Sequence, residues 1–285
     1  MSSLRVARIP YLNSVPFYQN VDDGSFDLVD LPPRMLGQAA RRGEVDAGIM
    51  SLCDSFRSPE FTALGSLGVA CDGPAHSVLL FSRLSMDRLS GASVAVTGQT
   101  STSYPLLRLL LEQRYGVDAA RYVRREQAAD EDDAVLLIGD AALREAASAG
   151  LMPGERDYAA GSMSLTAGRW RQVLDLSAAW KRWQGQSFVF ARWVVRREAP
   201  TAASAELLDR LATSLDQSLR DLRPLAAAHG GQAGLDADAA YAYLMGFTYR
   251  LGAPESEAIE RFRALLSDSP WWEESTPLQR PETTT

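Results

Sequence analysis

The sequence predicts a two-lobed α/β protein with a ligand cleft between its lobes. Patterns typical of strands and helices alternate over 4–149, an apolar strand pattern returns at 188–196, and helical patterns follow. This alternation favours parallel sheets with crossover helices. With 285 residues, 46% of them hydrophobic, the chain is long enough for two compact units. Because ligands bind at the carboxyl ends of strands in open sheets, two facing lobes predict an interlobe cleft.

The first block of elements precedes residue 84. Its predicted strands cover 4–9, 26–31 and 45–50. One helix is predicted to start at Asn13 and Ser14, with Pro16 in its first turn, and another covers 35–42. The strand predicted at 77–82 is almost wholly apolar, which indicates a central place in its sheet.

The second and third blocks complete the predicted lobes. The second contains strands at 92–97, 121–124 and 134–138 and helices at 104–115 and 140–149. The return strand at 188–196 is followed by helices at 202–229, 237–245 and 255–266. We place the two crossings near Arg83 and Gln186. Lobe one then comprises 1–83 plus 187–285, and lobe two comprises 84–186.

Composition and charge exclude several classes of function. A net charge of -7 argues against nucleic-acid binding, which needs a basic face. The acidic run 130–133 is expected to be a solvated loop. No apolar run approaches the roughly 20 residues of a membrane span, and the first residues lack the apolar core of a signal peptide, so we expect a cytoplasmic protein. Cys53 and Cys71 are expected to be free buried thiols.

Familiar catalytic motifs are absent from the sequence. His76 and His229 are the two histidines, and no metal-binding spacing of His and Cys occurs, so no metal is expected. The G-x-S-x-G motif of serine hydrolases is missing, as are the glycine-rich motifs that bind nucleotides. No cofactor is therefore expected.

The run Thr100-Ser101-Thr102-Ser103 is the most informative local feature. It lies between a predicted strand and a predicted helix, where free N–H groups and a partial positive charge suit a carboxylate or phosphate. Capping by a single serine is the simpler interpretation. Four hydroxyls exceed what capping needs, so we predict ligand contact.

Other polar residues also stand at strand ends. Asn13 and Ser14 follow the first strand, and Asp140 follows the strand at 134–138; each has helix capping as an alternative role. His76 and Ser77 precede the apolar strand at 77–82. For His76, a structural or solvent-facing role competes with that of a general base.

Five segments together resemble one family. They are Y-L-N-S-V-P-F at 11–17, G-E-V-D-A-G at 43–48, C-D-G-P-A-H-S-V-L-L at 71–80, T-S-T-S at 100–103 and L-I-G-D-A-A-L at 137–143. In this order they resemble the chorismate dehydratases of the futalosine route to menaquinone. The first and third segments are the specific ones, and the resemblance covers roughly residues 5–265.

The resemblance implies a fold, a reaction and a site. The fold is the type II periplasmic-binding-protein-like fold, and the reaction converts chorismate to 3-[(1-carboxyvinyl)oxy]benzoate with loss of water. The matching motif positions make Asn13 and Ser77 the catalytic pair. With them we group the candidate substrate-binding residues Ser14, His76, Thr100, Ser101, Thr102, Ser103 and Asp140.

This reaction suits a sequence with few strong bases. Dehydration makes the ring aromatic, so positioning matters more than an aggressive catalyst. The base is expected to be the substrate's own enolpyruvyl carboxylate, with His76 and Asp140 as rivals. Alternatives are a non-catalytic binding protein, the naphthoate synthase of the same route, or a dehydratase of a related acid such as prephenate, whose Thr-Arg-Phe signature is absent. The terminal helices are candidates for a homodimer contact.

Overall fold

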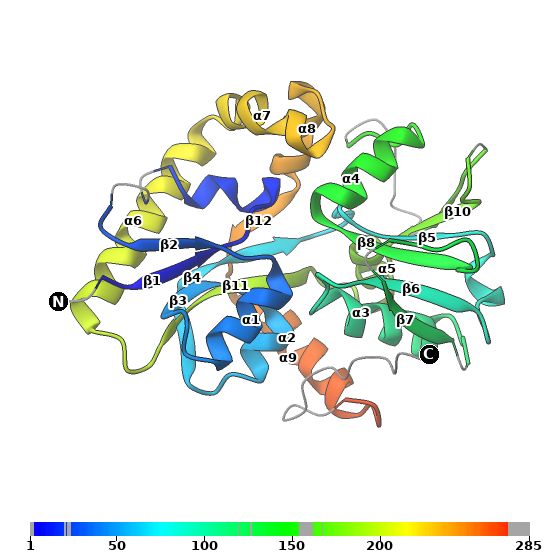
Figure 1. The fold of residues 1–285 in the computed structure, drawn as a ribbon, viewed down its shortest axis with the longest axis horizontal. Helices are drawn as coiled ribbons and strands as arrows, with labels where there is room; N and C mark the ends of the chain where they lie inside the picture. The colour runs from blue at the N-terminus through cyan, green and yellow to red at the C-terminus, as the bar shows by residue number, and fades with distance from the viewer. Residues whose placement is uncertain are drawn as a thin grey trace.

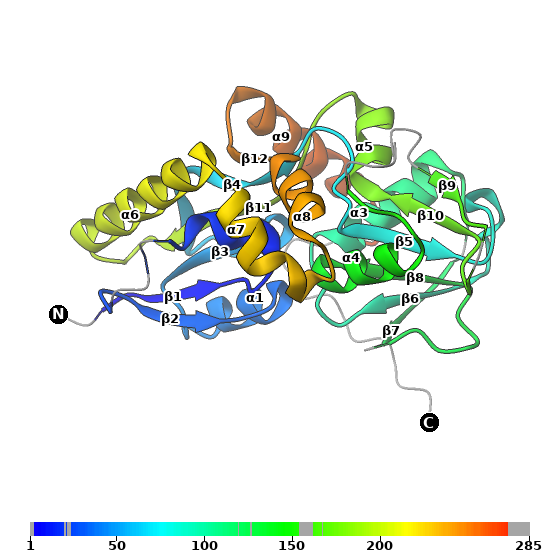
Figure 2. The ribbon, with the colours of Figure 1, turned by 90° about the horizontal axis from the view of Figure 1, so that it is seen from above.

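The fold consists of two six-stranded sheets that lie side by side, each covered by helices (Figures 1 and 2). The structure is a computed structural model that describes residues 3–272 except 20, 22–23, 119, 126, 154–161 and 167. Each sheet forms the centre of one lobe. The predicted two-lobed α/β architecture is therefore confirmed.

The first sheet has the strand order β12-β4-β11-β3-β1-β2. Its strands are β1 (Arg5–Arg8), β2 (Asp27–Asp30), β3 (Ala47–Ser51), β4 (Phe61–Cys71), β11 (Phe188–Arg196) and β12 (Phe247–Arg250). β1 is parallel to β2 and β3, whereas β11 is antiparallel to β3 and β4. Trp193 of β11 is fully buried and meets Phe17 edge to face, with ring centroids 5.8 Å apart, in the core of this lobe.

The second sheet has the order β7-β6-β8-β5-β10-β9. Its strands are β5 (Val78–Ser82), β6 (Ser93–Thr97), β7 (Arg121–Arg125), β8 (Ala134–Ile138), β9 (Ser162–Ser164) and β10 (Gln172–Asp175). β6 is parallel to β7 and β8, but β5 is antiparallel to β8 and β10. Both sheets are therefore mixed, and the expectation of parallel sheets holds only for part of each. β5 enters directly from the other lobe without a crossover helix, which a parallel pairing would need.

The first crossing between the lobes differs from the expected position. Strand β5 belongs to the second sheet, so the chain leaves the first sheet within 72–77 and not near Arg83. The return lies within 185–187, between α5 and β11. The sequence of an apolar strand does not indicate which of two sheets the strand joins. The long strand β4, which precedes the crossing, was also not predicted. The corrected crossing places Ser77 at the boundary between the lobes.

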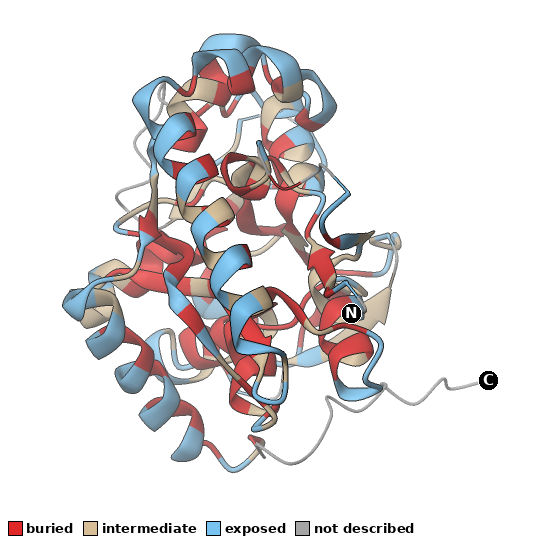
Figure 3. Ribbon diagram, turned by 90° about the vertical axis from the view of Figure 1, so that its left-hand side faces the viewer, coloured by how far each residue is buried: buried red, intermediate tan, exposed pale blue. Residues whose placement is uncertain are grey.

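Helices cover both sheets, and the outward-facing sides of these helices are exposed (Figure 3). They are α1 (Pro33–Arg41), α2 (Leu52–Phe56), α3 (Ser103–Leu109), α4 (Gly139–Ser148), α5 (Leu176–Gln184), α6 (Thr201–Arg220), α7 (Arg223–His229), α8 (Ala237–Met245) and α9 (Ala253–Ser267), with the short segments η1 (Leu12–Phe17), η2 (Met86–Arg88), η3 (Leu110–Arg114) and η5 (Gly230–Ala233). The helix predicted at 202–229 breaks after Arg220, because Pro224 starts a new helix and cannot continue the old one. The first predicted helix is the single 3₁₀ segment η1.

The C-terminal helix α9 joins the two lobes in one hydrophobic cluster. Phe262 of α9 meets Trp180 of α5 and Phe188 of β11, with ring centroids 5.7 and 5.0 Å away. Helix α8 lies over the junction between the two sheets, beside α4 (Figures 1 and 2), and shares a cluster with Leu12 of η1 and Leu143 of α4. No helix among the described residues is long and apolar enough to cross a membrane.

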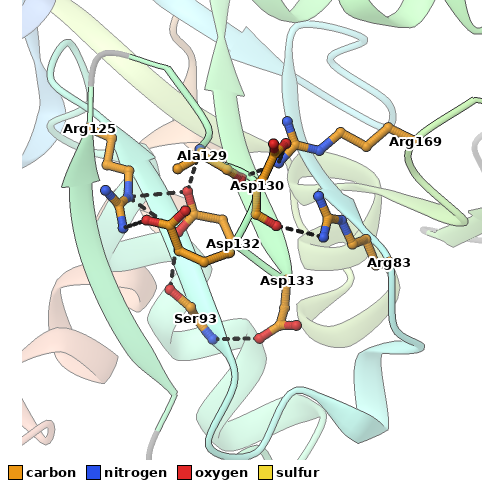
Figure 4. A network of polar contacts seen from close by, with 9 residues as sticks. Arg83, Ser93, Arg125, Ala129, Asp130, Asp132, Asp133 and Arg169 are labelled. Carbon is orange, nitrogen blue, oxygen red and sulfur yellow. Dashed lines mark hydrogen bonds and ion pairs between the residues drawn. The ribbon is translucent and has the colours of Figure 1, made fainter.

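The acidic run at 130–133 is partly a structural element (Figure 4). Asp130 is exposed as expected, but Asp132 is fully buried and accepts hydrogen bonds from Ser93 Oγ at 3.1 Å and Ala129 N at 2.7 Å. Arg125 supplies the opposite charge at 3.2 Å. The expectation of a wholly solvated loop was wrong, because the cation that pairs with Asp132 comes from the neighbouring strand β7.

Candidate active site

A cavity at the lobe junction is lined by residues of both lobes. The lining residues are Ile9, Tyr11, Asn13, Ser14, Pro33, Ile49, Ser51, Val69, Ser77, Val78, Ser101, Thr102, Ser103, Ile138, Gly139, Phe190, Ala191 and Phe247. Six predicted site residues are among them. His76, Thr100 and Asp140 are not. None of these lining residues is an acid, an arginine, a lysine or a histidine, so the cavity offers apolar walls with neutral hydrogen-bonding groups.

Asn13 lies on η1, a segment shaped by its neighbour. The buried Ser14 hydroxyl donates to the carbonyl oxygens of Ile9 at 2.5 Å and Tyr11 at 2.8 Å, which fixes the turn. Ser14 thus holds the turn as a donor to carbonyl oxygens and does not cap η1, which has no side-chain cap hydrogen bond. The Asn13 amide makes no hydrogen bond with any described residue, so it can serve a ligand.

Ser77 lies at the end of the crossing between the lobes and is buried. The Tyr243 hydroxyl donates to Ser77 Oγ at 2.8 Å, and the Ser77 hydroxyl donates to the Ala75 carbonyl oxygen at 3.3 Å. Burial raises the pKa of Tyr243 well above its usual value, so the phenol keeps its proton. Because Ser77 Oγ accepts this bond, its own proton points elsewhere, and in the structure it goes to the Ala75 carbonyl oxygen, so a ligand would have to replace that long bond. Tyr243 was missed because it lies on α8, 166 residues away in sequence.

His76 holds the crossing in shape and does not line the cavity. Its φ of 58° is the one positive value among described non-glycine residues. The fully buried Asp175 accepts N–H bonds from Ala75 at 3.2 Å, His76 at 2.7 Å and Ala178 at 3.0 Å. Burial lowers the pKa of His76, against the opposing charge of Asp175, so the imidazole is neutral at pH 7.

The four hydroxyls at 100–103 have different roles. Thr100 donates to Thr97 O at 2.9 Å within its own turn. Ser101 donates to Asp54 Oδ2 at 2.6 Å, and Thr102 accepts from Cys53 N at 3.1 Å, so both connect the second lobe to α2 of the first. Ser103 lines the cavity and has no hydrogen-bond partner among the described residues. The turn is thus mainly a contact between lobes, with Ser103 left for a ligand.

Asp140 belongs to a separate contact across the junction. It lines a neighbouring pocket that includes Arg8 and His229, and its Oδ1 accepts from Leu12 N at 3.4 Å. Burial raises the pKa of this carboxyl. Beside it the Tyr11 hydroxyl donates to Gln99 Oε1. These contacts join the two lobes directly.

Residues 4–268 match a protein family described as menaquinone biosynthesis. The chorismate dehydratase of Thermus thermophilus is 32% identical over 270 residues, which cover 90% of this chain and 95% of that protein. The chain belongs to the menaquinone biosynthesis family. The resemblance inferred from the five segments is thereby confirmed.

Solved structures place this family member in a known fold. Protein AF1704 from Archaeoglobus fulgidus superposes with a TM-score of 0.73 at 18% identity, over 93% of this chain and 97% of that one. The alkanesulfonate-binding protein SsuA from Xanthomonas axonopodis pv. citri gives 0.59 at 13% identity, over 94% and 92%. The periplasmic sulphonate-binding protein SsuA from Escherichia coli gives 0.55 at 16%, over 100% and 95%. The predicted periplasmic-binding-protein-like fold is confirmed.

No metal centre is visible in the part of the chain that the structure describes: no group of three or more His, Cys, Asp or Glu side chains gathers there. Cys53 and Cys71 are free and buried, as expected. Burial raises the pKa of Cys71 to about 12, so this thiol stays protonated and is a poor nucleophile.

Gly139 lets the lobes of this family member approach each other. It has a φ of 59°, and a Cβ there would lie 3.0 Å from the Tyr11 ring. Gly139→Ala should therefore loosen the junction as well as strain the backbone. We expect faster amide exchange in peptides covering 10–18, because Leu12 N loses its bond to Asp140.

Gly150→Ala is the matched control for this prediction. Gly150 ends the same helix with a φ of 73°, but nothing lies within 4 Å of its Cβ position. Both variants should lose about 1–2 kcal/mol of unfolding free energy from backbone strain. If exchange over 10–18 changes equally in both, Tyr11 and Gly139 do not hold the junction.

Proposed function

We propose that this protein removes water from chorismate and so forms 3-[(1-carboxyvinyl)oxy]benzoate. The observation that carries the proposal is the 32% identity to a chorismate dehydratase along nearly the whole chain. The site supports it, because Asn13 of the first lobe and Ser77 at the crossing between the lobes line the same cavity. The apolar walls suit the substrate ring, and the neutral polar groups suit its oxygen substituents.

The base in this proposal is the substrate's own enolpyruvyl carboxylate. It takes the proton from the ring carbon that bears the ether. The electrons of that C–H bond form the new ring double bond, and the neighbouring C–O bond breaks with loss of the hydroxyl group. The carboxylic acid proton then reaches the departing oxygen, so water leaves and the carboxylate is restored. The lining residues support this route, because none carries a carboxylate, imidazole or amine.

The protein's part is to orient the reacting groups and to exclude water. Asn13 and Ser77 donate hydrogen bonds to the leaving hydroxyl or to a substrate carboxylate. Ser103 offers a further donor on the second lobe. The contacts of Tyr11 with Gln99 and of Leu12 with Asp140 keep the cleft closed while the ring becomes aromatic.

We also propose that the protein works in the cytoplasm. Its two cysteines are free buried thiols, the usual state in a reducing compartment. A homodimer through the terminal helices stays a prediction.

The reaction is tested by mixing the purified protein with chorismate and no added cofactor. We expect an aromatic product lighter by one water, detected by absorbance and mass spectrometry. Asn13→Ala and Ser77→Ala should each lower kcat by about 100-fold or more, as loss of a hydrogen bond to a developing charge does. Ser148→Ala, at an exposed serine of α4, is the control. Unchanged chorismate with the native protein would instead favour a non-catalytic binding protein.

We expect that neither His76 nor Asp140 is needed as the base. His76→Asn, which tolerates the positive φ, and Asp140→Asn should each keep kcat within about tenfold of the native value. The rate should also stay level from about pH 6 to 9, because the lining residues include no group that titrates in that range. A loss of several orders of magnitude in either variant would overturn the substrate-assisted route.

Tyr243 is expected to act through Ser77. Tyr243→Phe removes one hydrogen bond, worth about 1–1.5 kcal/mol, and should lower kcat about tenfold with little change in KM. In a Ser77→Ala background the same change should have no further effect on kcat, whereas damage to packing would add to the loss. Tyr241→Phe on the same helix is the control. Additive losses would show that Tyr243 only stabilises the fold.

A further inference from the structure

A buried carboxylate lies behind one wall of the central cavity. Asp54 of α2 is 5% exposed and is not among the residues that line the cavity. Its Oδ2 accepts hydrogen bonds from Ser51 Oγ at 2.8 Å and from Ser101 Oγ at 2.6 Å. Both serines line the cavity, Ser51 from β3 of the first lobe and Ser101 from the second lobe. One carboxylate therefore connects the two hydroxyls of this wall.

The Asp54 side chain is held in place from several sides. Arg41 of α1 pairs with its Oδ1 at 3.0 Å, which leaves Oδ2 for the serines. The backbone of α1 passes so close that a Cβ at Gly37 would lie 2.4 Å from Asp54 Cγ. The Asp54 N–H donates to Ser51 Oγ at 3.2 Å, so the same serine begins α2. A carboxylate held this way is a fixed acceptor with no proton to give.

The hydroxyl protons of this wall can be counted. A serine hydroxyl has one proton to donate and two lone pairs. The Ser101 proton goes to Asp54, and the Ser51 proton goes either to Asp54 or to Ser101 Oγ at 2.9 Å. In both arrangements neither serine has a proton left, whereas each oxygen keeps at least one lone pair. Toward a ligand, Ser51 and Ser101 are therefore hydrogen-bond acceptors.

This polarity differs from what the run 100–103 indicates by sequence. Hydroxyl groups at a turn before a helix suit a carboxylate only if their protons are available. Thr100 gives its proton to Thr97 O, and Ser101 gives its proton to Asp54. A ligand carboxylate at Ser101 would meet lone pairs and the like charge of Asp54, which is unfavourable. A ligand hydroxyl brings the proton that these oxygens lack.

We propose that Ser51 and Ser101 accept a hydrogen bond from a hydroxyl group of the ligand, with Asp54 as the positioning residue that sets their polarity. The proposal rests on the proposed function, in which the ligand is chorismate and the group is the leaving hydroxyl. With its proton directed at the serines, the hydroxyl keeps its own lone pairs for the proton that arrives from the carboxylic acid. The wall also distinguishes substrate from product, because the product keeps both carboxylates but has lost the hydroxyl.

The test compares the KM for chorismate with the inhibition constant Ki of the product, 3-[(1-carboxyvinyl)oxy]benzoate. Ser101→Ala removes one acceptor, and Asp54→Asn brings an amide N–H that can bind Ser101 Oγ and turn the serine into a donor. Each variant should raise the KM by roughly 3- to 10-fold, as loss of one neutral hydrogen bond does, and leave the Ki unchanged. Ser148→Ala, at the exposed serine of α4, should change neither constant.

A different role for these residues gives a different result. If they bound a carboxylate or only joined the lobes, KM and Ki would rise together, because the product carries the same carboxylates. A parallel rise in both constants, or an unchanged KM in a folded variant, overturns the proposal. Two variants on different lobes keep the test valid if one of them fails to fold.

Failure of the proposed function gives a separate outcome. If the native protein leaves chorismate unchanged, calorimetry replaces kinetics, and the dissociation constants of chorismate and of the product are compared in the same variants. Weaker binding of chorismate alone then still supports the hydroxyl contact, although the protein is not a dehydratase. If neither compound binds, both proposals are overturned.

Discussion

The buried carboxylate of Asp175 is the constraint on which the rest of the site depends. It caps α5 through Ala178 N and at the same time accepts the N–H groups of Ala75 and His76. A fully buried charge is costly unless it is saturated with hydrogen bonds, so this carboxylate fixes the crossing strongly. The left-handed backbone at His76 persists because Asp175 requires it. Ser77 is the residue after His76, so the fixed crossing determines its position whether or not Tyr243 or a ligand contacts it.

Once the crossing is fixed, the lobes meet through polar contacts that use few charges. Tyr11, Ser101 and Thr102 each reach a residue of the opposite lobe, and Gly139 leaves room for the Tyr11 ring. The cavity enclosed this way has neutral walls. A neutral enclosure suits an elimination whose product is aromatic, because the main requirement is orientation and not a strong protein base.

The alternation of strands and helices predicted most of the elements and the two lobes, because hydrophobic period reports local structure. It did not place β5 in the right sheet, because pairing partners depend on contacts far apart in sequence. The same contrast between local and long-range information applies to the residues of the site. Asn13 and Ser77 were predicted because they stand in local segments that resemble a known family. Tyr243 and Asp175 were missed, because their partners are more than 90 residues away and nothing local marks a helix residue or a cap as part of a site.

The fold alone does not distinguish this chain from the sulfonate-binding proteins that share it. A binding protein needs only lobes that close on a ligand, and the fold provides this by itself. Catalysis needs an additional group whose proton is directed at the reacting atoms. In the proposed mechanism Ser77 supplies such a group. Tyr243, a phenol that burial keeps protonated, donates to Ser77, and the serine proton, which goes to the Ala75 carbonyl oxygen in the structure, turns to the ligand. Tyr243 comes from a helix that packs over the lobe junction, so in this proposal the position of the serine hydroxyl depends on the packing that joins the lobes.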